Sequence, residues 1–169
     1  MTKEQKQLAA QQIVGFRLPR YREIPDVGLY LEQTTQYIAG FLDPVVAGIT
    51  SSMISNYVKK GLISSPAKKR YNREQIAYLF FIAVAKNVLS LDALDGFIRL
   101  QRSTYPLETA YDYFVEEFEN LLYFSFELKD TIATVGEETS DEKRLLYSCI
   151  ASATQMIYLE KCLQVLAEE

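Results

Sequence analysis

Histidine and tryptophan are absent from this chain of 169 residues. The lack of histidine removes the commonest general base and the commonest zinc ligand. The seven glycines are isolated from one another, so the sequence has neither type of glycine-rich nucleotide-binding loop, and it has no Gly-x-Ser-x-Gly motif. We therefore expect no catalysis, no cofactor and no metal. An enzyme of unfamiliar type would need a tight cluster of acids, which one sequence does not reveal.

Cysteines and long apolar runs are also scarce. Cys149 and Cys162 lie thirteen residues apart on one expected helix, and hence on different faces, so we expect two reduced, buried thiols. The longest apolar run, residues 76–85, has ten residues, about half of what a bilayer span requires. Residues 1–12 are mainly polar and lack the apolar segment of a secretory signal. These features predict a cytoplasmic protein without a membrane segment.

Acids are missing from one stretch of the chain. Between Pro44 and Arg73 there are six cations and no acid, although the whole protein has a net charge of −4. Residues 74–169 instead hold seventeen acids and seven bases. A basic segment beside an acidic one suits a polyanion, and double-stranded DNA is the first candidate partner. The alternative is a solvated face on an ordinary helical protein. The six cations are Lys59, Lys60, Lys68, Lys69, Arg70 and Arg73.

Helical periodicity dominates the first half of the sequence. It predicts helices over residues 3–14, about 26–42 and about 50–60. Asp26 is the expected N-cap of the second helix. Gly61 is the expected left-handed residue that ends the third.

The next segment combines a loop and two helices. Residues 63–71 are too short for a helix, so we expect a tight loop or a small hairpin. Asn72, with Gln75 three residues later, resembles a capping box that opens a helix over about 73–88. A further helix is expected over about 91–102.

The last third predicts a long helical hairpin. A heptad stripe predicts a first arm over residues 107–135, made of Leu107, Tyr111, Phe114, Phe118, Leu121, Ser125, Leu128, Ile132 and Val135. Gly136 breaks that helix, and Thr139 with Glu142 forms a second capping box before the last helix. The last helix has two adjacent apolar rows, one of Leu145, Cys149, Met156, Leu159, Leu163 and Leu166, the other of Leu146, Ile150, Ala153 and Ile157. A lone hairpin cannot cover both rows, so we predict a homodimer through residues 105–168.

The first arm mixes aromatic rings with carboxylates. Eight of the chain's aromatic residues lie in residues 105–126. They could form a pocket for an apolar cation, but we prefer a bundle or dimer core with a charged outer face. Asp112, Glu116 and Glu119 share one helix face and could bind a hard cation. A solvated acidic stripe is the interpretation we prefer, because no other ligands are in view.

A set of motifs runs through residues 48–100. They are Gly48-Ile49-Thr50, then Asn56-Tyr57-Val58-Lys59-Lys60-Gly61-Leu62-Ile63, then Tyr71, and then Leu79-Phe80-Phe81-Ile82. This pattern resembles the winged-helix head of mercury-resistance-type (MerR-type) regulators. In that family a recognition helix ends in a tyrosine followed four residues on by Gly-Leu, and a basic wing ending in tyrosine comes next. Residues 49–91, and more loosely the whole chain, resemble an uncharacterised bacterial family known chiefly from Gram-positive organisms and often described as a regulator (domain of unknown function 1836).

The MerR-type resemblance implies that the helix over 50–60 enters the major groove while the 63–71 loop contacts the DNA backbone. Ser55 stands where that family usually has arginine, and the wing is shorter and lacks its usual glycine. Short polar side chains on this helix suit base edges or phosphates, although N-capping alone would also explain them. Tyr57 and Tyr71 could be either core residues or phosphate contacts. The candidate DNA-binding residues are Thr50, Ser51, Ser52, Ser55, Asn56, Tyr57, Lys59, Lys60, Lys68, Lys69, Arg70, Tyr71 and Arg73.

Together these features predict an all-α protein with a winged helix-turn-helix head followed by a long C-terminal helical hairpin. The expected segments are an N-terminal arm (1–21), the head (22–102) and a dimerisation or sensing hairpin (103–169). The expected function is transcription regulation by a DNA-binding homodimer, with room for an unidentified small-molecule effector. The alternative is a non-catalytic protein–protein interaction module that reuses the winged-helix head.

Overall fold

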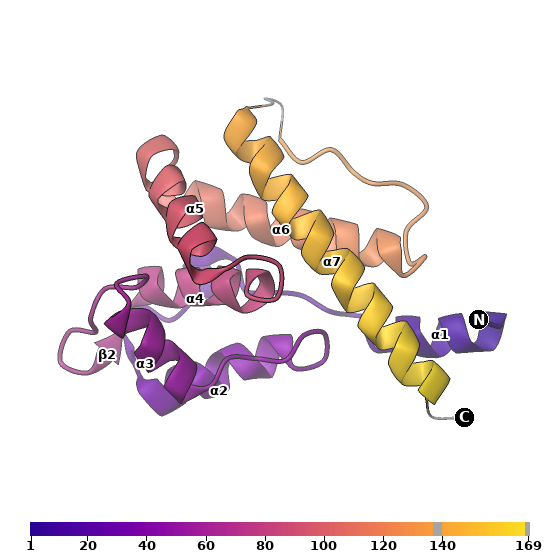
Figure 1. The fold of residues 1–169 in the computed structure, drawn as a ribbon, viewed down its shortest axis with the longest axis horizontal. Helices are drawn as coiled ribbons and strands as arrows, with labels where there is room; N and C mark the ends of the chain where they lie inside the picture. Colours follow the sequence, from indigo (N-terminus) through magenta and orange to yellow (C-terminus); the bar gives the residue numbers. More distant parts are fainter. Residues whose placement is uncertain (137–139, 168–169) are drawn as a thin grey trace.

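The computed structural model describes residues 1–136 and 140–167. Within these residues the fold is mostly helical, with seven α-helices and one two-stranded antiparallel sheet (Figure 1). None of the described helices is both long enough and apolar enough to cross a bilayer. The elements are α1 (Lys3–Gln11), a 3₁₀ turn η1 (Tyr21–Glu23), β1 (Leu29–Tyr30), α2 (Leu31–Leu42), α3 (Ser51–Lys59), β2 (Arg70–Tyr71), α4 (Arg73–Ala85), α5 (Leu91–Thr104), α6 (Leu107–Ser125) and α7 (Asp141–Ala167).

Helix α4 is the central helix of the fold. It is buried on nearly all sides from Gln75 to Ala85, as expected for a helix that is apolar all round. It contacts α2 on one side and α6 and α7 on the other (Figure 1). One contiguous core joins residues from α1 through α7. Cys149 and Cys162 are free thiols within it, as predicted, and burial raises the pKa of Cys149 to about 11.

Several helix ends follow the predicted capping signals. The backbone N–H of Met53 donates to Thr50 Oγ1 over 3.2 Å at the start of α3. Gly61 has a φ of +75°, and the Leu62 N–H donates to the Tyr57 carbonyl over 2.9 Å, which closes a Schellman motif. The capping box of Asn72 and Gln75 is present at α4. These ends depend on local hydrogen bonds, and the sequence predicted them.

The start of α2 was predicted wrongly. Asp26 does not cap it, because the helix begins only at Leu31. Gly28 has a φ of +74°, which no helix accommodates, and the chain then enters β1. Leu29 pairs with Tyr71 in an antiparallel register. This short sheet is the part of the architecture that an all-α prediction missed.

The first arm of the predicted hairpin was also too long. Helix α6 ends at Ser125, and the heptad continuation through residue 135 is wrong. Glu127 takes a left-handed φ of +57°, and the Leu128 N–H donates to the Tyr123 carbonyl over 2.9 Å. This is a second Schellman motif, with glutamate at the position where glycine usually gives the signal.

Residues 126–136, which follow α6, form no helix or strand and return along α6 (Figure 1). The buried Asn120 side chain donates to the Ala133 carbonyl over 2.7 Å and accepts the Ala133 N–H over 3.2 Å. Thr139, the predicted cap of the last helix, lies outside the described residues. Ser140 Oγ accepts the Lys143 N–H over 3.2 Å at the start of α7.

Helix α7 packs against α6 and runs obliquely across it, with α1 against its C-terminal half (Figure 1). Of its two predicted apolar rows, the one containing Ile150, Ala153 and Ile157 is buried. Most of the other row faces outward. We call these exposed residues the α7 row; they are 40–56 % exposed and comprise Leu145, Met156, Leu159, Leu163 and Leu166.

Candidate nucleic-acid interface

Helix α3 presents a short polar surface. Ser52, Ser55 and Asn56 are exposed, whereas Ile54 and Tyr57 hold the opposite side in the core. Ser55 Oγ donates to the Ser51 carbonyl over 2.9 Å. The side chains of Ser52 and Asn56 have no hydrogen-bond partner within the described residues, so both can bind a ligand.

The first turn of α3 is already engaged within the molecule. Thr50 is the N-cap, as the capping interpretation predicted. Ser51 Oγ donates to Glu32 Oε1 over 3.0 Å and lies 3.0 Å from Thr35 Oγ1. These contacts fix α3 against α2, which is the role of the N-terminal polar residues here.

The two candidate tyrosines lie in the core. Tyr57 and Tyr71 are each only 4 % exposed, and burial raises the pKa of both. Of the two interpretations of these tyrosines, the structure agrees with the core position. Their burial anchors α3 and β2 in the core and so positions the exposed side chains of these two elements.

Residues 67–70 form a tight two-residue turn that precedes β2. Ala67 and Arg70 form a bridge, and the Arg70 N–H donates to the Ala67 carbonyl over 2.9 Å. Lys68 and Lys69 occupy the two central positions with φ values of +49° and +62°. Positive φ at both positions is typical of a type I′ turn, which normally uses Asn-Gly. The turn therefore places two exposed ammonium groups at its tip, in a backbone conformation unfavourable to lysine.

Arg70 and Arg73 have partners inside the molecule. The Arg70 guanidinium lies 4.8 Å from the centre of the Tyr30 ring, and its Nη2 donates to the Tyr30 hydroxyl over 3.2 Å. Arg73 Nε donates to the Ile24 carbonyl over 2.9 Å, and its guanidinium lies 5.7 Å from the Tyr21 ring. Both arginines thus attach the β2–α4 corner to residues 21–30.

The four lysines differ from the arginines. Lys59, Lys60, Lys68 and Lys69 are all exposed, and within the described residues none has a hydrogen-bond or ion-pair partner. Helix α3 and the loop that leads to β2 lie at the same end of the molecule (Figure 1). The four lysines and the polar surface of α3 therefore belong to one end of the fold.

A groove beside α3 adds residues that the sequence did not single out. Ser52 and Asn56 line it together with Lys86, Asn87 and Ser90, and its volume is about 550 Å³. Lys86 Nζ donates to the Ala47 carbonyl over 2.9 Å, and burial lowers the pKa of Lys86. Lys86 is the C-cap of α4 and lies outside the basic stretch that the sequence singled out. Only the tertiary structure, in which α3 and the α4–α5 connection line one groove, shows it.

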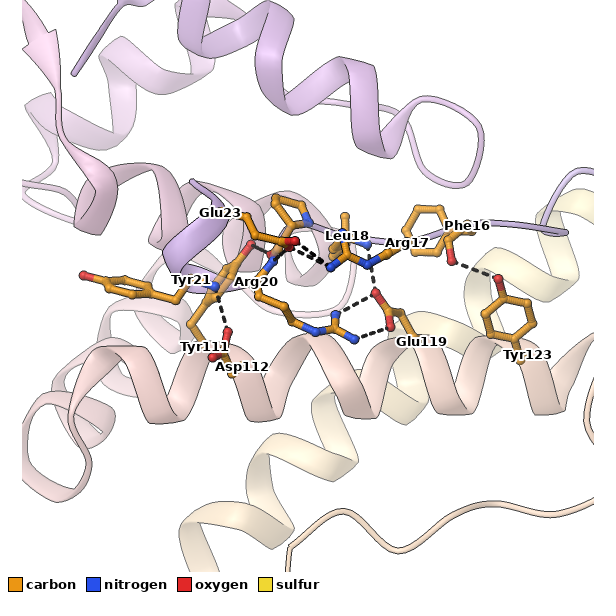
Figure 2. A network of polar contacts seen from close by, with 11 residues as sticks. Phe16, Arg17, Leu18, Arg20, Tyr21, Glu23, Tyr111, Asp112, Glu119 and Tyr123 are labelled. Carbon is orange, nitrogen blue, oxygen red and sulfur yellow. Dashed lines mark hydrogen bonds and ion pairs between the residues drawn. The ribbon is translucent and has the colours of Figure 1, made fainter. Parts of the chain in front are cut away.

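Of the three acids predicted as a solvated stripe or a cation site on α6, Glu116 is exposed, whereas Asp112 and Glu119 bind another part of the chain. Residues 16–23, which alone we call the arm from here on, lie along α6 (Figure 2). Asp112 and Glu119 accept hydrogen bonds from the arm, as does Glu108 at the start of α6. Glu119 accepts from the Arg20 guanidinium and from the Leu18 N–H, each over 2.9 Å. Asp112 accepts the Tyr21 N–H over 2.7 Å. No group of acids, histidines and cysteines within the described residues could hold a metal ion.

Two tyrosine hydroxyls of α6 continue this contact. Tyr111 donates to the Pro19 carbonyl over 3.0 Å, and Tyr123 donates to the Phe16 carbonyl over 2.9 Å (Figure 2). Burial raises the pKa of Tyr111 strongly, so its proton stays in place. The arm is therefore held to α6 along its whole length by charged and neutral donors.

Comparison with known proteins supports one of the two resemblances. The model of a family described as a domain of unknown function (DUF1836) matches residues 19–114, whereas no MerR or helix-turn-helix family model does. Neither the curated proteins nor the solved structures include a significant match. The matched segment begins in the arm, includes α2 to α5, and ends in the first half of α6. The chain belongs to the DUF1836 family.

Proposed function

We propose that this protein is a transcriptional regulator that binds duplex DNA as a homodimer. The observation that carries the proposal is the set of four exposed lysines that have no partner among the described residues, beside the polar surface of α3. The stretch that contains them has no acid between Pro44 and Arg73. A paired carboxylate would compete with phosphate for an ammonium group. None of the four lysines is paired with a carboxylate of the described residues, which leaves them available to DNA.

The proposed docking places α3 in the major groove and the 67–70 turn on the backbone. The order of α2, α3, the turn with β2, and α4 resembles that of a winged helix-turn-helix, in which the second helix of the pair is the reading helix, and this resemblance supports the docking. Ser52 and Asn56 are the side chains of α3 free to contact base edges. Lys59, Lys60, Lys68 and Lys69 neutralise phosphates.

The proposed dimer contact is the α7 row. From Met156 to Leu166 its residues follow steps of three, four and three, the spacing of a coiled-coil seam. Exposed apolar residues in a continuous row of this kind mark an interaction site. A second copy of the same helix is the simplest complementary partner, because a two-fold axis pairs identical faces.

Salt titration of DNA binding tests the proposal. With four neutralised phosphates per protomer, the logarithm of the affinity should fall with the logarithm of the salt concentration with a slope of about −3.6 per protomer. The binding site itself would come from selection out of a random duplex pool. Failure of the protein to retain any duplex at about 50 mM salt would contradict the proposal.

The exposed α7 row also favours a second candidate, a non-catalytic interaction module. In that case the row and the α3 surface both bind proteins, and the acidic second half of the chain repels nucleic acid. Parallel pull-downs with duplex DNA and with protein baits separate the two functions. Retention on protein baits without any DNA binding would favour the module.

A further inference from the structure

A cavity of about 80 Å³ lies where four helices meet, and it opens to the surface. Phe81 of α4, Phe97 of α5, Ala110 and Phe114 of α6, and Leu146 of α7 all line it. The wall that faces the space is almost entirely carbon. An apolar space of this kind excludes ordered water, because water needs several polar partners.

Three polar residues around the cavity are linked by hydrogen bonds, and the Lys143 ammonium at its edge lies 5.4 Å from the centre of the Tyr113 ring. The Tyr78 hydroxyl donates to Gln101 Oε1 over 2.7 Å, and Gln101 Nε2 donates to the Tyr105 carbonyl over 2.8 Å. The Tyr105 hydroxyl then donates to Ser140 Oγ over 3.0 Å. A ligand that needed hydrogen bonds from these groups would have to break this chain, so the site disfavours polar ligands.

We propose that this cavity is a binding site for a small, neutral, apolar ligand containing one ring. The aromatic side chains on three of its walls offer edges and faces to such a ring. An apolar cavity of about 150 Å³ accommodates benzene. The cavity here is about half that volume, so a single ring fits only by reaching into the open mouth, and a fused ring system has no room.

The position of the site gives it a regulatory consequence, which rests on the proposed DNA-binding function. Phe81 belongs to α4, the helix that directly follows the 67–70 turn and β2. Ser140, at the end of the hydrogen-bond chain, caps α7, which carries the proposed dimer contact. A ligand in the cavity contacts helices of both regions at once, so it should change the affinity for DNA.

Toluene and benzoate are suitable probes, because they have the same ring and differ in charge. Toluene at ten times its dissociation constant should raise the Tm by about 3–6 °C, and benzoate at the same concentration should not. In NMR spectra, bound toluene should show nuclear Overhauser contacts with the methyl groups of Ala77 and Ala110. The absence of these contacts, or equal stabilisation by benzoate, would overturn the proposal.

A variant that fills the cavity, compared with one that carries the same substitution at an exposed position, tests the site. Ala110→Phe places a ring in the space and should abolish the toluene-induced shift, whereas Ala93→Phe, an exposed position on α5, should preserve it. If Ala110→Phe does not fold, the toluene contacts in the unmodified protein decide the question. Retention of the full shift in a folded Ala110→Phe variant would overturn the assignment.

DNA affinity in the presence of toluene tests the regulatory part separately. Saturating toluene should change the affinity for a selected duplex about fivefold or more. Toluene binding without any change in DNA affinity would exclude the effector role. Toluene binding by a protein that binds no DNA would instead contradict the proposed function and leave the ligand site standing.

Discussion

The Arg20 guanidinium donates two hydrogen bonds of 2.9 Å to the Glu119 carboxylate, ninety-nine residues further along the chain (Figure 2). The same carboxylate accepts the Leu18 N–H. The hydrogen bond to Glu119 raises the pKa of Arg20. Bidentate pairing of this kind is stronger and more directional than a single ion pair. Arg20 and Glu119 thus join the arm to α6. The sequence had assigned these two residues to separate segments of the chain.

Replacing Glu119 should destabilise the protein more than replacing a neighbouring acid. Glu119→Ala leaves the Arg20 guanidinium and the Leu18 N–H without their shared acceptor, at a cost of about 2 kcal/mol. The expected fall in Tm is about 4–8 °C in thermal unfolding followed by circular dichroism. The control is Glu116→Ala on the same helix, because Glu116 is exposed and has no hydrogen-bond partner within the described residues. Equal Tm values for the two variants would show that Glu119 contributes no net stability to the contact between the arm and α6.

Substitutions that relieve the backbone of the 67–70 turn should stabilise the fold and weaken DNA binding. Replacing Lys68 by Asn and Lys69 by Gly puts the preferred type I′ residues at φ values of +49° and +62°, which should stabilise the fold by about 1–2 kcal/mol. The same change removes two cations, so the salt dependence of DNA binding should weaken by about 1.8 units of slope per protomer. Denaturant unfolding and salt titration measure the two effects on one protein.

A second double variant separates charge from backbone strain in that experiment. Lys59→Ala with Lys60→Ala removes two cations from the end of α3, where Lys59 is helical and Lys60 has ordinary helical dihedral angles. It should weaken the salt dependence equally without any gain in stability. If the turn variant keeps the full salt slope, the turn does not contact phosphate.

The α7 row should control the oligomeric state. Leu163→Glu places a charge in the exposed seam and should convert a dimer to a folded monomer in analytical ultracentrifugation. Gln164→Glu adds the same charge one residue further along, outside the row, and should leave the dimer intact. Since Leu163 is 55 % exposed, neither variant should lower the monomer's helical content. A dimer that survives Leu163→Glu would place the contact elsewhere.

Glu117 should make stability depend on pH. It is 3 % exposed, its Oε2 lacks a hydrogen-bond partner within the described residues, and burial raises its pKa, with a contribution from Glu116. A raised pKa in the folded state means that folding favours the protonated acid, so stability falls as pH rises above the ordinary pKa near 4.5. Glu117→Gln should therefore stabilise the protein by about 1 kcal/mol at pH 8. The gain should vanish below about pH 4, where both states of the wild type are protonated. A gain that is the same at both pH values would rule out ionisation as its cause.

Local signals account for the features that were predicted correctly. Thr50, Gly61, and the pair Asn72 and Gln75 mark helix ends through hydrogen bonds that span three to five residues. The end of α6 carries no comparable signal, because Glu127 stands where glycine is usual and the apolar heptad spacing continues past it. The heptad spacing therefore predicted ten further residues of helix that the Schellman motif prevents.

The candidate interface likewise contains some features that the sequence predicted and others that it could not predict. Exposure of Lys59, Lys60, Lys68 and Lys69 follows from charge and from loop position, which the sequence contains. The engagement of Arg70 by Tyr30 depends on the pairing of β1 with β2. Two-residue strands leave no periodic pattern in a sequence, so this pairing could not be predicted.

The sequence by itself determined the helical class, both ends of α3, the start of α4, and the segregation of charge between residues 44–73 and 74–169. These properties depend on residues that are neighbours in the sequence, so they are the same whichever way the chain packs. Only the tertiary structure decided that the acids of α6 bind the arm, that the α7 row faces outward, and that four helices enclose an apolar cavity. Each of these depends on which surfaces meet after collapse, a choice made by the packing of the whole core rather than by any local segment.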